Sequence, residues 1–216
     1  MVRRIAAVLA GIWLLAQPLS AQKVEVSFNA GYTLSEGIQG EDRNILGLVY
    51  NRAEVNSGGS FHFTVGFFVN PKAQVEFLYG RQSSELTIKD PAPSLHISDL
   101  DVSNYHGNFV YNWGEEDAKV RPFAFIGLGA TSYSFGNGPS GQKIDGETKF
   151  STTWGGGVKF YLAPAVGLKL TARWTPTYIK SSASGYWCDP FYGCWVLGDP
   201  DYSHQFDISG GVTIRF

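Results

Sequence analysis

The amino-acid sequence predicts an all-β fold, an eight-stranded antiparallel up-and-down β-barrel that crosses a membrane. Apolar and polar residues alternate along eight segments, and the connections between these segments alternate between long and short. No apolar run after residue 21 approaches the roughly 20 residues that a membrane helix needs. Because a chain in lipid must satisfy every backbone hydrogen bond internally, a closed barrel is the spanning fold that remains.

The N-terminal residues have the composition of an export signal. A basic start at Arg3-Arg4, an apolar core at 5–15 and a small-residue cleavage site at Leu19-Ser20-Ala21 follow one another in the expected order. A membrane anchor would need about 20 apolar residues, and Gln17-Pro18 interrupts the run before that length. We therefore expect residues 1–21 to be a cleaved signal peptide.

The remaining residues, 22–216, are expected to form one β-barrel domain without a linker, tandem repeat or low-complexity tract. Removing Arg3 and Arg4 with the signal changes the formal net charge from −2 to −4. The sequence has no clustered basic surface, which excludes nucleic acid as an expected partner.

The first four strands are predicted at 23–34, 60–69, 73–88 and about 100–113, because each has an aliphatic or aromatic residue at every second position. The turn Asn70-Pro71-Lys72 separates the second from the third, since proline fixes its own φ and cannot donate to a ladder. The outward, apolar row of these strands contains Val24, Val26, Phe28, Ala30, Tyr32, Leu34, Phe61, Phe63, Val65, Phe67, Val69, Val75, Phe77, Tyr79, Tyr105, Phe109, Tyr111 and Trp113.

The last four strands are predicted at 121–133, 149–161, 166–177 and 202–216. Both faces of 121–133 are apolar, so the alternation leaves open which face of that strand points outward. The strand at 202–216 has the cleanest alternation in the chain and ends on an aromatic residue. One of its faces suits lipid and the other suits water.

The connections predict how the barrel is oriented. Long connections at 35–59, 89–97, 134–148 and 178–201 alternate with short turns at 70–72, 112–119 and 162–165. Transmembrane barrels combine brief turns on one side of the membrane with extended loops on the other. With an even number of strands, both ends of the mature chain lie on the side of the short turns.

The interior of an eight-stranded barrel is just wide enough for side chains to fill, so an open pore is not expected. The alternation places a nearly balanced set of charged residues inside, which can pair once they leave bulk water. We interpret this set as a structural network rather than a proton or ion path. It consists of Glu25, Glu76, Lys159, Lys169, Arg173, Asp207 and Arg215.

The export signal, the eight strands, the strand glycines Gly127, Gly129 and 155–157, and the ending at 210–216 together resemble the small outer-membrane protein β-barrel family, of the OmpA-like and OmpX-like type. The resemblance covers the whole mature chain. It implies the outer membrane of a Gram-negative-type bacterium, periplasmic termini, lipid as the surroundings and a monomer without cofactor.

The resemblance also implies a partner during insertion. In this family the assembly machinery of the outer membrane reads the terminal aromatic strand, which assigns an assembly signal here to Phe216 with Ile214 and Val212. The resemblance says little about activity, because members of this family include adhesins, defence proteins, anchors and lipid-modifying enzymes. We expect a non-enzymatic structural or surface-recognition role, with an unknown surface ligand as a further partner at the outer loops.

Cys188 and Cys194 are the two cysteines of the chain and lie close together in the longest outer connection. An oxidising compartment favours a disulfide between them. A metal site is not expected, because two more ligands would be needed and only Asp189 and His204 are near. The surrounding aromatic residues form either a membrane-interface girdle or a contact surface for a partner or glycan. The candidates for such contacts are Trp187, Phe191, Tyr192 and Trp195.

The alternative function is a lipid A modifying hydrolase of the deacylase type. His96-Ile97-Ser98 has the His-x-Ser spacing of that enzyme family, and Glu85, Asp99 or Asp101 could orient the histidine. Residues two apart on a strand face the same side, as acyl transfer requires. The other residues expected around that motif are absent, so no catalytic residue is assigned. We expect the remaining histidines, His62, His106 and His204, to be wall or network residues.

Overall fold

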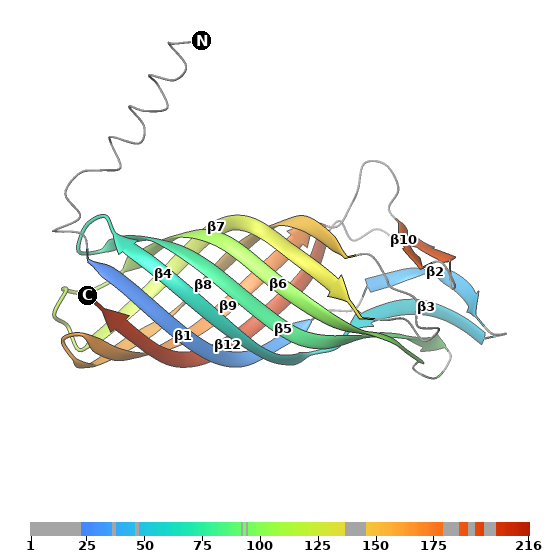
Figure 1. Cartoon of the computed structure of the whole chain (residues 1–216), viewed down its shortest axis with the longest axis horizontal. Coiled ribbons are helices and arrows are strands. Elements are labelled where there is room, and N and C mark those ends of the chain that lie inside the picture. Colours follow the sequence, from blue (N-terminus) through green and yellow to red (C-terminus); the bar gives the residue numbers. More distant parts are fainter. Residues whose placement is uncertain are drawn as a thin grey trace, which may run out of the picture.

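The computed structural model describes residues 23–35, 38–45, 48–91, 93, 95–136, 146–178, 186–189, 193–196 and 202–216. Eight long strands form the barrel (Figure 1): β1 (Val24–Ser35), β4 (Gly58–Phe68), β5 (Ala73–Pro91), β6 (Leu95–Asn112), β7 (Val120–Phe135), β8 (Glu147–Ala163), β9 (Val166–Tyr178) and β12 (Tyr202–Arg215). The fold class predicted from the sequence is confirmed. The predicted signal peptide, 1–21, lies outside the described residues.

Every neighbouring pair of these strands is antiparallel, and the ring closes because β1 pairs with both β4 and β12. The register gives the stagger of the closed sheet. Following paired residues once around the barrel from Thr177 of β9 leads back to Gly167 of the same strand, a displacement of 10 residues. For eight strands this shear corresponds to a strand tilt of about 40°.

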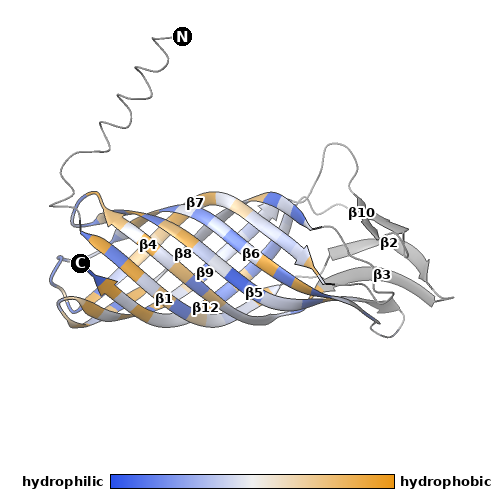
Figure 2. Ribbon diagram, in the orientation of Figure 1, coloured by the Kyte–Doolittle hydropathy of each residue, from blue (hydrophilic) through white to orange (hydrophobic). Residues whose placement is uncertain are grey.

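The outer surface of the barrel is apolar and the inner surface is polar. Outward residues such as Phe28 and Ile208 are 59% and 70% exposed, whereas Ser27 and Ser209 beside them are buried. Figure 2 shows the resulting alternation of apolar and polar positions along the strands. A contiguous apolar belt of this size is unsuited to water and suits hydrocarbon. No helix of the described residues is long and apolar enough to cross a membrane.

The structure settles which face of β7 points inward. Phe123 and Phe125 are buried in the lumen, while Ile126 and Leu128 are exposed on the outside. The reason lies on the neighbouring strand β8, where a Cβ at Gly155 would come within 2.5 Å of the Phe125 ring and one at Gly157 within 2.9 Å of the Phe123 ring. Glycines on one strand therefore make room for aromatic rings on the next.

The outer end of the barrel contains more strand than the sequence predicts. The expected loop at 35–59 contains β2 (Ile38–Ile45) and β3 (Leu48–Val55), and β3 pairs with the outer part of β5. The prediction of a long loop at 89–97 is wrong, because β5 continues to Pro91 and β6 begins at Leu95. Strands that extend beyond the lipid need no apolar outer face, so they lack the alternation that marks the membrane-spanning parts.

The expected loop at 178–201 also contains strand, the short hairpin of β10 (Tyr186–Asp189) and β11 (Gly193–Val196). The opposite end of the barrel has the short turns that were predicted. In the first, Asn70 Oδ1 accepts hydrogen bonds from the amides of Lys72 at 2.9 Å and Ala73 at 2.8 Å. The second contains Gly114, whose φ of 84° suits glycine. β1 begins and β12 ends at this same end of the barrel (Figure 1).

Candidate functional site: the barrel interior and the two barrel ends

The seven charged residues predicted for the lumen all lie on the inner face of the barrel. Six of them are buried and Arg215, nearest the short-turn end, is partly buried. They come from strands on different sides of the ring, so their side chains meet across the interior. The contacts occur at successive heights along the barrel axis.

The layer closest to the short turns is built around Glu25. Its carboxylate pairs with Lys159 Nζ and accepts a hydrogen bond of 2.6 Å from the Tyr161 hydroxyl. Arg215 approaches the same carboxylate at 3.7 Å and donates to the Tyr161 oxygen. The guanidinium of Arg215 also lies over the Tyr161 ring, 4.2 Å from its centroid. Each charge in this layer therefore has an opposite charge or an aromatic face beside it.

The next layer crosses the full width of the barrel. Lys169 Nζ of β9 lies 2.8 Å from Glu76 Oε2 of β5, and these strands are opposite one another in the ring. Asn108 Nδ2 donates to the other carboxylate oxygen of Glu76 at 3.2 Å. The Phe123 ring lies between the two lysines of the lumen, 5.2 Å from the Nζ of Lys169 and of Lys159.

A third layer surrounds Asp207. Its Oδ2 accepts hydrogen bonds from Ser60 at 2.7 Å and Thr33 at 3.0 Å, and His62 Nδ1 lies 3.7 Å from Oδ1. Arg173 is the residue directly opposite Asp207 in the β9–β12 register, and its guanidinium lies 5.8 Å from the centroid of the Phe125 ring. Each of the three acidic residues of the lumen thus accepts hydrogen bonds from at least one other strand of the ring.

Amide and hydroxyl side chains form the layer above the charges. Gln205 of β12 donates to Gln82 at 3.2 Å and accepts from Asn104 of the opposite strand β6 at 3.5 Å. Thr131 is hydrogen-bonded to Asn104 at 2.7 Å and to Ser151 at 2.9 Å. Toward the outer end of the barrel, buried apolar residues of β3, β6 and β7 form a cluster. It consists of Val55, Leu100, Val102 and Tyr133, with Phe135 packed against them.

Sequence reasoning missed Arg121, which is fully buried in the lumen. Its Nη2 donates to the carbonyl oxygen of Pro71 at 2.7 Å, whereas its Nε and Nη1 have no hydrogen-bond partner among the described residues. Arg121, Phe123 and Phe125 alternate along β7 and so face the same side of the strand. Because the sequence left open which side of this strand faces inward, it could not assign Arg121 to the lumen.

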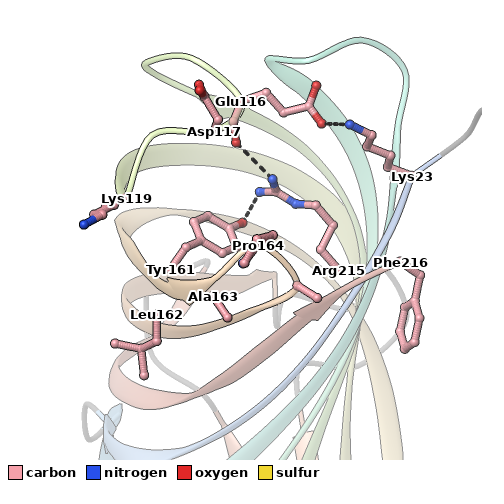
Figure 3. Close-up of a pocket in the computed structure, with 11 residues that line it drawn as sticks. Lys23, Glu116, Asp117, Lys119, Tyr161, Leu162, Ala163, Pro164, Arg215 and Phe216 are labelled. Carbon is pink, nitrogen blue, oxygen red and sulfur yellow. Dashed lines mark hydrogen bonds and ion pairs between the residues drawn. The ribbon is translucent and has the colours of Figure 1, made fainter.

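The short-turn end contains a cavity of about 750 Å³ (Figure 3). Lys23 pairs with Glu116 at its rim, and the hydrogen bond from Lys23 keeps the pKa of Glu116 below its ordinary value. Arg215 Nη1 donates to the Glu116 carbonyl oxygen at 3.1 Å. The Phe216 ring is 74% exposed and points away from the cavity, and Val212 and Ile214 lie in the same outward row.

The histidine and serine of the predicted His-x-Ser motif face opposite sides of β6, which corrects the expectation that they share a face. The β5–β6 register pairs Leu86 with Ser98 and Thr87 with His96, so Ile97 is an extra residue at a β-bulge. Ser98 is buried, and its hydroxyl donates to the Asp99 carbonyl oxygen. His96 is exposed on the outer face.

The acidic residues proposed around this motif lie in two separate groups. Glu85 and Asp99 lie beside His96 on the outer face. Asp101 instead forms an ion pair with Arg81, with 2.6 Å between Oδ2 and Nη2. The serine of the motif therefore does not lie beside its histidine.

The register places Cys188 directly opposite Cys194 in the β10–β11 hairpin, with Trp187 opposite Trp195. Opposed residues of an antiparallel pair have Cα atoms about 4.5 to 5.5 Å apart, which falls in the range that a disulfide spans. The disulfide itself stays a prediction. The contact candidates Phe191 and Tyr192 lie outside the described residues.

A closed barrel with an apolar outer belt and a polar, charge-paired interior defines a transmembrane β-barrel protein. The family model described as "Outer membrane protein beta-barrel domain" matches residues 5–216, and the chain therefore belongs to the outer-membrane protein β-barrel family. No curated protein matches the chain.

Solved structures of small outer-membrane barrels share the fold at low sequence identity. Neisserial surface protein A is 17% identical with a TM-score of 0.56, over 91% of this chain and 98% of that one. OprG from Pseudomonas aeruginosa is 12% identical with a TM-score of 0.62, over 91% and 96%. The outer membrane protein AlkL is 15% identical with a TM-score of 0.57, over 90% of each chain. At these identities the likeness shows the fold alone.

Proposed function

We propose that this outer-membrane barrel is a non-enzymatic protein whose outer end has a structural or surface-recognition role, with both termini in the periplasm. The main support for the proposal is the set of side-chain contacts that cross the barrel interior. Hydrogen bonds and ion pairs join strands on opposite walls at several heights, including Lys169 with Glu76 and Gln205 with Asn104.

This interior does not favour conduction. A water-filled path would have to separate Lys169 from Glu76 and Lys159 from Glu25, and each freed ion would need a new partner or water. The apolar cluster toward the outer end offers little solvation to a passing ion. The network is better suited to fixing the barrel wall, on which the outer strands are displayed.

The outer strands support the second half of the proposal. β5 and β6 continue past the apolar belt, and β3 extends the sheet by pairing with β5 (Figure 1). The structurally similar neisserial protein is named a surface protein. A wide β-structured platform, as opposed to short loops, gives a rigid surface that a partner can bind without a large ordering cost.

The alternative, a lipid A modifying hydrolase, is less favoured. Acyl transfer to water needs a base beside the nucleophile or beside the attacking water. The bulge at Ile97 turns His96 outward while Ser98 stays buried, so this motif does not supply such a pair.

Conductance measurement in a planar lipid bilayer tests the closed interior. The purified wild-type barrel should give no sustained channel openings in symmetric potassium chloride. A Glu76→Ala/Lys169→Ala variant, which removes the bridge of one layer, is the matched control for whether the network limits conduction. Stable openings of porin size in the wild-type protein would refute the proposal.

Two further measurements address the outer end and the enzyme alternative. Replacing residues 38–55 with a short turn should leave a heat-modifiable barrel. It should also reduce attachment of the displaying cells to a host surface if the role is recognition, whereas equal attachment would assign the outer end a structural role. Lipid A from cells that overproduce the protein should have an unchanged mass profile. Loss of an acyl chain that depends on His96 would favour the hydrolase.

A further inference from the structure

Three side chains with metal-binding atoms gather on the outer face of the β5–β6 hairpin, beyond the apolar belt. They are Glu85, His96 and Asp99, all exposed. Each offers one ligand atom, and these atoms lie within 4.8 Å of one another. Glu85 and Asp99 are directly opposite in the register, which fixes the distance between their backbones.

The β-bulge is what brings the histidine to this cluster. Along β6 the even-numbered residues Ser98, Leu100 and Val102 are buried, and regular alternation would place His96 in the same inward row. The extra residue at Ile97 shifts the parity by one, so His96 joins Asp99 on the outer face. Bulges are frequent where a side chain must be re-aimed at a site.

Neighbouring groups hold two of the three residues in place. Asn56 Nδ2 lies 3.4 Å from Glu85 Oε2, and the Asn56 amide donates to the Glu85 carbonyl oxygen at 2.9 Å. The Gly136 amide donates to the Asp99 carbonyl oxygen at 2.8 Å. The two backbone bonds fix the strand positions of Glu85 and Asp99, and the Asn56 side-chain bond reaches the Glu85 carboxylate itself. Hydrogen bonds to a ligating side chain orient it and raise metal affinity.

We propose that Glu85, His96 and Asp99 form a binding site for a divalent cation of the zinc class on the outer face of the barrel. One imidazole and two carboxylates are ligands that zinc takes readily, whereas calcium prefers six to eight oxygen atoms. Three protein ligands leave one position of a tetrahedral site open for water or for an anionic group.

The geometry is close to that of a bound site. With bonds of about 2.0 to 2.1 Å, ligand atoms in a tetrahedral zinc site lie roughly 3.3 Å apart. His96 Nε2 is already 3.6 Å from Asp99 Oδ1. The remaining approach needs only rotation of exposed side chains about their χ angles, with the backbone held by the ladder and the bulge.

Isothermal titration of the purified full-length barrel in detergent with zinc sulfate tests the site. The wild-type protein should bind one zinc ion saturably, and His96→Ala and Asp99→Asn should each weaken binding at least ten-fold. Calcium chloride should bind far more weakly than zinc. Because protons compete for the ligand atoms, zinc affinity should fall when the pH is lowered.

The matched control is Asp101→Asn, which removes a carboxylate from the same strand that is already paired with Arg81. It should keep wild-type zinc affinity, as should the double variant Cys188→Ser/Cys194→Ser, which separates this site from a thiol site. Heat modifiability on a gel verifies that each variant is folded. No saturable binding by the wild-type protein, or equal affinity in His96→Ala, would overturn the proposal.

Discussion

Removing Lys169 should destabilise the barrel more than any conservative change at an unpaired lumen position. Its Nζ is 2.8 Å from Glu76 Oε2, and both side chains are buried. At an effective dielectric constant of 20, two unit charges at that distance attract by roughly 6 kcal/mol. Part of this attraction offsets the cost of taking the two ions out of water.

Lys169→Met leaves the Glu76 carboxylate buried, with the Asn108 amide as its one hydrogen-bond donor among the described residues. Removing one partner of a buried ion pair costs about 3 to 5 kcal/mol, and we expect a loss in that range. Glu76→Gln should cost a similar amount, lessened because Lys169 retains the face of the Phe123 ring. The double variant should cost less than the sum of the two, with a coupling of about 2 to 3 kcal/mol.

Urea titration of the refolded barrel in detergent micelles, followed by tryptophan fluorescence, gives the free energy of unfolding. Thr171→Ser is the control, because Thr171 faces the same lumen from the same strand and its hydroxyl has no hydrogen-bond partner among the described residues. It should change stability by well under 1 kcal/mol. Strict additivity of the two single variants, or a loss below about 1 kcal/mol for each, would show that the pair is not coupled.

Three further predictions follow from the wall and the ends of the barrel. Leu170→Arg should lower the free energy of unfolding by about 2 to 4 kcal/mol, because Leu170 faces lipid, whereas a polar substitution of Thr171, which faces the lumen, should lower it much less. Equal losses in the urea titration would contradict the register. Deleting Phe216 should lower the amount of assembled barrel in the outer membrane far more than its stability in vitro, and unchanged surface levels would show that this residue is not read during insertion. Cys188→Ser/Cys194→Ser should retain heat modifiability but be cut faster by protease between residues 178 and 201, while two free thiols on native cells would argue against the disulfide.

The membrane-spanning strands could be predicted from the sequence because the lipid on one side and the polar interior on the other constrain the residue type at every position of the wall. An outward position such as Phe28 must be apolar and its neighbour Asn29 faces a polar interior, so each residue of a strand carries part of the signal. The strand at 202–216 shows this most clearly, because Tyr202, Phe206 and Ile208 are exposed while Ser203, Gln205 and Ser209, which alternate with them, are buried.

The sequence-based prediction failed for strands outside the lipid, and it left open the orientation of β7, which depends on packing against a second strand. Beyond the lipid, β2 and β3 lack a regular apolar alternation in the sequence; β2 pairs with β3, and β3 pairs with β5. The parity of β7 depends on the glycines of β8, which make room for Phe123 and Phe125. The residue pattern of β7 alone does not show how much space the side chains of β8 leave beside it.

Which charged residues form ion pairs inside the lumen depends on the stagger of the whole ring. The alternation along each strand could therefore predict that these residues face inward, but not which of them contact one another. Counting paired residues from Glu76 in the two directions around the barrel leads to residue 165, just before β9 begins, and to residue 175 within β9. The position of β9 level with Glu76 is the midpoint of these two, since half the shear accumulates over half the circumference. Lys169 lies within one residue of that midpoint and faces inward, so the two side chains meet across the barrel. A register changed by two residues at any one strand pair would preserve every inward and outward assignment, yet it would separate this pair along the barrel axis.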